Sequence, residues 1–244
     1  MKILISDTET AGLYTPSMPS KDPAQPHIVS VAAQLVDAHC NGLEELDLMV
    51  KPDGWTIPAE AIEIHGITNE RAMDEGIGED EVLHQLLCLQ AKADLRAGYN
   101  QPFDSRIVRL GLYRHARGLL REYGYGTDTD TAIGAVEPLV DAMREEVADW
   151  WYYGVAQYDA MGPIGKLAAI PGRKRMKLAE AYEFCTGERM PGAHTAMGDV
   201  EGTRRVMQYL LDHDHVRLDR EWIGYDLAFR DKKRQDKLEA RRRY

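Results

Sequence analysis

Cysteine, long apolar runs and positive charge are all scarce in this sequence. The three cysteines, Cys40, Cys88 and Cys185, are far apart and show no CxxC spacing, which argues against a disulfide framework or a zinc site and favours a reducing compartment. No apolar run approaches the roughly 18–20 residues that span a bilayer. The N-terminus turns acidic at Asp7, too early for a signal peptide. We therefore predict a cytoplasmic protein with no membrane partner.

Basic residues gather at the C-terminus. The 244 residues include 30 Lys and Arg against 40 Asp and Glu, a net charge of −10. Residues 216–244 hold 10 of the basic and 6 of the acidic side chains, so residues 1–215 hold 20 and 34 and carry a net charge of −14. An acidic body disfavours passive binding along nucleic acid, but it suits a divalent cation and an enzyme that grips a strand end. We predict a domain at residues 1–215 and a basic C-terminal tail at residues 216–244.

The apolar pattern predicts a strand meander followed by alternating helices and strands. Strands are expected at residues 2–6, 28–36, 43–50, 95–99 and 138–143, with an Asn41-Gly42 turn between the second and third. Helices are expected at residues 58–64, 79–93, 102–117, 177–185 and 195–212. Residues 14–27 form a proline-rich loop, and residues 144–175 have no clear pattern. This order predicts an α/β fold with a mixed sheet covered on both faces.

Two acidic residues end the first predicted strand. Asp7 and Glu9 are two residues apart, so a strand places both carboxylates on one face, where they can converge on a cation. Carboxylates this close repel each other unless a metal ion or a proton intervenes. The structural alternative is a strand end with two solvated acids.

Two later segments add a histidine and further carboxylates. Asp104 lies in the first turn of a predicted helix, and His194 precedes Asp199 at the start of the last long helix. Taken alone, Asp104 fits a routine first-turn acid and His194 a capping residue. Together the segments supply four carboxylates and one imidazole, a set that matches two-metal cleavage of a phosphodiester with a histidine as base.

These motifs resemble the DEDDh group of DnaQ-like 3′–5′ exonucleases, which includes the proofreading epsilon subunit of bacterial DNA polymerase III, RNase T and oligoribonuclease. Residues 7–13 (DTETAGL) resemble the first motif, residues 100–104 (NQPFD) the second and residues 194–199 (HTAMGD) the third. Residues 64–68 (IHGIT) resemble a segment on the substrate side. The resemblance covers residues 1–211.

The resemblance implies an RNase H-like fold, a five-stranded mixed sheet flanked by helices. It implies two Mg²⁺ or Mn²⁺ ions held by the four carboxylates of Asp7, Glu9, Asp104 and Asp199, with His194 as the general base. It also implies that Glu60 and His65 contact the terminal nucleotide and that Asn100 and Phe103 line the same pocket. For Phe103 the alternative is a core position.

We predict a 3′–5′ exonuclease that releases nucleoside 5′-monophosphates, with single-stranded DNA favoured and a 3′–5′ exoribonuclease as the alternative. A haloacid dehalogenase-type phosphatase would explain an Asp-x-Glu-x-Thr strand end but would leave His194 and Asp199 without a role. A binding module that has lost catalysis conflicts with five filled catalytic positions. Ala11 and the long segments 14–27 and 144–175 depart from the family pattern, so substrate choice, a replication or repair partner and the oligomeric state are left open.

Overall fold

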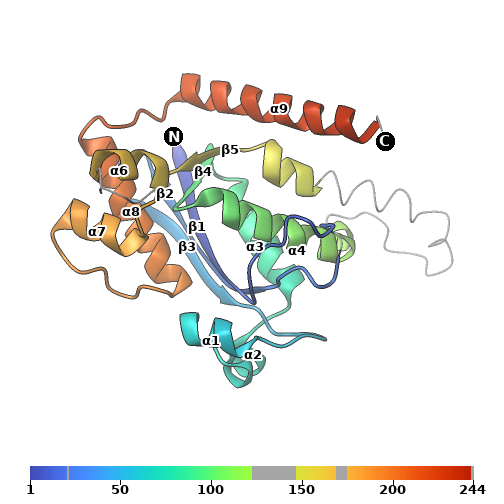
Figure 1. Cartoon of the computed structure of the whole chain (residues 1–244). Helices are drawn as coiled ribbons and strands as arrows, with labels where there is room; N and C mark the ends of the chain where they lie inside the picture. The colour runs from blue at the N-terminus through green and yellow to red at the C-terminus, as the bar shows by residue number, and fades with distance from the viewer. Residues whose placement is uncertain (21, 123–146, 169–174, 243–244) are drawn as a thin grey trace.

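Five strands form one mixed sheet in the order β3-β2-β1-β4-β5. The computed structural model describes residues 1–20, 22–122, 147–168 and 175–242. The antiparallel meander comprises β1 (Lys2–Thr10), β2 (Ile28–Asp37) and β3 (Gly42–Met49). The parallel strands β4 (Leu95–Gly98) and β5 (Ala156–Asp159) continue the sheet beyond β1. The predicted mixed sheet flanked by helices is confirmed (Figure 1).

Alternation along β1 sends its side chains into two separate cores. Ile3 and Ile5 pack against one helix layer, whereas Leu4 packs against the other. The first layer contains α6 (Met161–Ala168), α7 (Leu178–Thr186) and α8 (Ala196–Asp212). The second contains α3 (Glu79–Gln90) and α4 (Gln101–Glu122). The odd-numbered positions 7 and 9 therefore face α8, and position 8 faces α4.

Two short helices lie beyond the carboxyl end of β1 (Figure 1). They are α1 (Ala59–His65) and α2 (Asn69–Glu75). Gly66 ends α1 with a left-handed φ of 73°, a conformation that costs glycine little. Thr68 begins α2, because its side chain accepts a hydrogen bond from the backbone of Arg71 at 3.2 Å.

The structure corrects the turn between β2 and β3. The predicted Asn41-Gly42 turn is wrong, because Asp37 organises a longer connection and Cys40 takes the left-handed φ of 59°. The Asp37 carboxylate accepts hydrogen bonds from the backbone of His39 and of Asn41 at 2.8 and 3.0 Å. The sequence pattern also missed α2 and β5. The strand predicted at residues 138–143 lies outside the described residues.

Helix α9 (Arg220–Arg242) covers the exposed edge of β5 (Figure 1). The carboxylate of Asp226 accepts a hydrogen bond from the backbone N–H of Gln157 at 2.8 Å and pairs with Arg230 at 2.6 Å. Trp222 packs edge-to-face on Tyr158, with ring centroids 5.8 Å apart. The first half of the predicted tail is thus a docked helix, and its Asp226 accepts a hydrogen bond from a backbone N–H of the edge strand β5. The division of the chain at residue 215 stays a prediction. Within the described ranges no helix is long and apolar enough to cross a membrane.

Candidate active site

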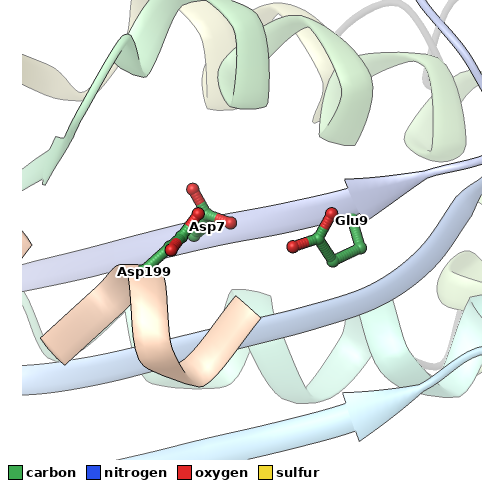
Figure 2. A group of neighbouring side chains, drawn as sticks. All are labelled: Asp7, Glu9 and Asp199. Carbon is green, nitrogen blue, oxygen red and sulfur yellow. The ribbon is translucent and has the colours of Figure 1, made fainter. Parts of the chain in front are cut away.

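Three carboxylates from β1 and α8 converge on one face of the sheet. Asp7 and Glu9 project from the end of β1 toward α8, and Asp199 enters from the first turn of α8 (Figure 2). One carboxylate oxygen from each residue lies within 4.8 Å of the other two. The structure therefore brings acids of the first and third sequence motifs together, as the family resemblance implies.

Burial and mutual repulsion strain this group of acids. Burial, with repulsion from Asp104, Asp199 and Glu9, raises the pKa of Asp7 well above its usual value. Burial and repulsion from Asp199 raise the pKa of Glu9 to about 7. Burial also raises the pKa of Asp199, against the hydrogen bond that it accepts from His194. Hard oxygen donors grouped this closely suit a divalent cation, so these residues fit the predicted metal site.

Asp104 lies on α4 and contacts β1 from the opposite side. Its Oδ1 accepts two hydrogen bonds from Thr8, at 3.0 Å from the backbone N–H and at 2.7 Å from the hydroxyl. Burial raises the pKa of Asp104, although the bonds from Thr8 oppose the shift. Asp104 is not one of the three residues whose oxygens group together, but its charge acts on Asp7. Its predicted role as a ligand stays a prediction.

Thr8 is a site residue that the sequence analysis did not single out. It sits between the two acids of the first motif, where alternation turns its side chain toward α4. Its place between Asp7 and Glu9 in the first motif is the one feature of the sequence that could have identified it. Thr8 holds one oxygen of Asp104 and so aligns α4 with the two acids of β1.

His194 lies on the exposed loop that precedes α8. Its φ is 67°, and its backbone N–H, at 3.3 Å, donates to Oδ1 of Asp199. Thr195 caps the helix by accepting from the backbone N–H of Gly198 at 3.1 Å. A Cβ on Gly198 would collide with the carbonyl of Gly192, so the third motif requires glycine at position 198. The loop is thereby fixed beside Asp199 while the imidazole stays open to solvent.

The residues predicted to contact substrate lie on α1. Glu60 is exposed in the first turn of α1, and His65 is buried at its last residue. The Nδ1 atom of His65 accepts from the backbone of Ile67 at 3.1 Å, and burial lowers the His65 pKa. The Nε2 atom of His65 is buried and has no hydrogen-bond partner among the described residues. A neutral His65 therefore carries an unused N–H donor.

Asn100 directly precedes α4, and Phe103 lies in its first turn beside Asp104. Asn100 adopts a φ of 61°, and its backbone N–H donates to Oδ1 of Asp159 at 2.9 Å. Phe103 is half-buried against the core under α3 and α4, which agrees with the alternative of a core position. Its place in a substrate pocket stays a prediction. Asp159 was missed because it ends β5, in a stretch that showed no clear pattern.

Comparison with known proteins shows a likeness in fold. No family model and no curated protein matches the sequence. A solved structure of exonuclease I aligns with a TM-score of 0.61 at 19% identity, over 92% of this chain and 42% of that one. An E. coli exonuclease I complex with a dT13 oligonucleotide aligns with a TM-score of 0.60 at 20% identity, over 86% and 40%. Exonuclease I from Methylocaldum szegediense aligns with a TM-score of 0.58 at 23% identity, over 86% and 40%.

These identities establish the fold alone. The chain also spans only about two fifths of the length of the exonuclease I chains that it matches. Activity, substrate and partners therefore have to be argued from the residues of this chain.

Proposed function

We propose that this chain is a metal-dependent 3′–5′ exonuclease that acts on single-stranded DNA and releases nucleoside 5′-monophosphates. The observation that carries the proposal is the convergence of Asp7, Glu9 and Asp199. The group sits in a fold shared with exonuclease I, which has been solved with single-stranded oligonucleotides and with product. The single-stranded DNA bound in one of these exonuclease I structures supports single-stranded DNA as the proposed substrate.

The donor set supports two divalent cations, Mg²⁺ or Mn²⁺, on the carboxylates of Asp7, Glu9, Asp104 and Asp199. All four residues offer hard oxygen ligands, and burial raises the pKa of each. When bound, such cations neutralise charge on the phosphodiester and assist the attacking and leaving oxygens. Among the matched proteins, one exonuclease I complex with single-stranded DNA was solved with zinc.

His194 is proposed to take the proton of the attacking water. The water oxygen bonds to phosphorus, the bond from phosphorus to the upstream 3′-oxygen breaks, and the leaving 3′-oxygen gains a proton from solvent. The imidazole is exposed and lies close enough for its charge to act on Asp199.

Four further residues are proposed to hold the terminal nucleotide. The buried, unpartnered Nε2 of His65 can donate to a ligand oxygen, since Nδ1 already accepts a hydrogen bond. Glu60 lies on the same helix, and Asn100 and Phe103 flank Asp104. A replication or repair protein as partner is part of the same proposal.

The test is hydrolysis of matched single-stranded DNA, duplex DNA and RNA, each labelled at the 5′ end. We expect shortening of the single-stranded DNA one nucleotide at a time. Chelator should abolish hydrolysis, and Mg²⁺ or Mn²⁺ should restore it. Asp7→Asn should be inactive with either cation, with exposed Glu63→Gln as a charge-matched control. Activity that survives thorough chelation would contradict the metal-dependent mechanism.

A further inference from the structure

Helix α9 presents two aromatic rings and two lysines to solvent. Tyr225 and Phe229 are four residues apart and are 74% and 49% exposed. Lys232 and Lys233 follow one helical turn later, and Nζ of Lys233 lies 4.7 Å from the ring centroid of Phe229. We call these four residues the α9 stripe. Neighbouring exposed rings of this size mark an interaction surface.

The α9 stripe adjoins a groove of about 240 Å³. The groove is lined by residues of α9, β5, the helical segment 147–153 and the start of α4, namely Pro102, Tyr152, Tyr153, Gln157, Arg230 and Lys233. Lys233 therefore belongs to both the stripe and the groove. Aromatic and basic side chains that share one groove are typical of surfaces that bind single-stranded nucleic acid.

The basic side chains in and beside the groove differ in whether an acidic partner contacts them. Arg230 is neutralised by Asp226, and Arg109 and Arg234 share Asp149. Lys232 and Lys233, by contrast, have no ion-pair partner within the described part of the chain. Because residues 1–215 carry a net charge of −14, a polyanion needs such a local positive surface.

One residue that lines the groove lies close in sequence to the predicted ligand Asp104 on α4. Pro102 lines the groove, and Asp104 lies two residues later in the same first turn. Helix α9 runs along the β5 edge, whereas α1 and α2 lie at the opposite end of the molecule (Figure 1). A strand whose 3′ nucleotide lies toward α1 would therefore extend past the start of α4 toward α9.

We propose that the α9 stripe and its groove hold the single strand upstream of the 3′ end. Tyr225 and Phe229 would stack on bases, and Lys232 and Lys233 would neutralise phosphates. The inference rests on the proposed function, since it takes single-stranded DNA as the ligand. Stacking on aromatic rings tolerates any base, which suits an enzyme that removes successive nucleotides.

The electrostatic part is tested by binding of 5′-labelled oligo(dT), measured by fluorescence anisotropy in chelator over a range of salt. Lys232→Gln/Lys233→Gln should make the slope of log K against log salt shallower by about 1.4, since each phosphate that a lysine neutralises adds about 0.7. The control Lys2→Gln/Lys92→Gln also removes two positive charges, but from outside the α9 stripe. Lys2 begins β1, and Lys92 pairs with Glu44. The control should keep the wild-type slope.

The stacking part is tested with Tyr225→Ala/Phe229→Ala. We expect binding to weaken roughly tenfold or more while the salt slope stays unchanged. Phe184→Ala on α7 is the control, because Phe184 is also exposed, at 45%, and lies away from α9. Circular dichroism should show that every variant keeps its helix content.

The outcomes separate this inference from the proposed function, because binding in chelator does not depend on hydrolysis. If the protein degrades DNA but both stripe variants bind oligo(dT) like their controls, the α9 stripe is not the strand path. A wild-type protein that does not bind oligo(dT) also overturns the inference. Weakened binding in both stripe variants supports it, even if the wild-type protein proves unable to hydrolyse DNA.

Discussion

Neutralising Glu9 should stabilise the metal-free protein. Burial and Asp199 raise the Glu9 pKa from 4.5 to about 7, which corresponds to about 3 kcal/mol against the ionised form. Glu9 is partly exposed, so solvent screening reduces this to about 1–2 kcal/mol. We therefore expect Glu9→Gln to increase the free energy of unfolding at pH 8 by that amount in chelator.

The pH dependence follows from the direction of the shift. A carboxyl group whose folded-state pKa is raised destabilises the fold at pH values above that pKa, and protonation relieves the penalty as the pH falls from about 8 toward 4.5. The advantage of Glu9→Gln should thus be largest at pH 8 and vanish as the pH falls below about 4.5. Urea unfolding at several pH values measures it. For a chain of this size each kcal/mol shifts Tm by roughly 2–4 °C.

With bound metal ions, the wild-type protein should become more stable than Glu9→Gln. A cation that binds only the folded state stabilises it by about 2.7 kcal/mol at a hundredfold excess over Kd. Wild-type protein should gain this with Mg²⁺ or Mn²⁺, and Glu9→Gln should gain less because one ligand is gone. Exposed Glu63→Gln is the charge-matched control. If Glu9→Gln destabilises the metal-free protein, or follows Glu63→Gln at every pH, the reasoning about the acidic group is refuted.

Three other predictions concern single residues. His194→Ala should lower turnover by about 10²–10⁴-fold in a single-turnover assay yet keep the thermal shift with Mg²⁺; a near-normal rate at neutral pH would place the base elsewhere. Burial raises the pKa of Glu79, but hydrogen bonds from His115 and His27 and a neighbouring arginine lower it to about 2. Glu79→Gln should therefore cost about 2–3 kcal/mol in urea unfolding at pH 7, and the loss should fade as the pH falls from 4.5 toward 2; a cost that is constant with pH would contradict the linkage. Gly198→Ala should slow hydrolysis at least as much as His194→Ala, because its Cβ collides with the preceding loop; unchanged kinetics would show that the loop position is not needed.

Local sequence signals predicted most of the fold because each one acts within a few residues. Gly66 and Gly187, for example, take the left-handed conformation that ends α1 and α7, close to the ends predicted for these helices. The apolar run of β2 marks a strand buried on both faces. By contrast β5 has four residues, AQYD, and its extended form depends on pairing with β4 and on the hydrogen bond that Gln157 donates to Asp226 of α9. No periodicity can reveal such a strand.

In the candidate site too, some residues could be predicted from local sequence and others could not. Asp7, Glu9 and Asp199 belong to short motifs, and the structure groups them. The motifs are held in place by contacts between elements that are distant in the sequence, such as Thr8 with Asp104 and Asp159 with Asn100. These partners cannot be found from spacing, since each contact depends on how α4 and β5 pack against β1.

The C-terminal segment shows how composition alone misleads. Charge alone predicts a basic tail at residues 216–244, yet Trp222, Ile223 and Leu227 pack against the core, and the carboxylate of Asp226 accepts a hydrogen bond from the edge of β5. A docked helix holds its charges at fixed positions, which a free tail does not. Because the Debye length at physiological salt is about 8 Å, the −14 charge of residues 1–215 acts on a bound strand mainly through nearby carboxylates. A strand anchored at the cation site and at the α9 stripe therefore meets favourable charge at both ends of its path, and the acidic surface elsewhere disfavours binding away from that path.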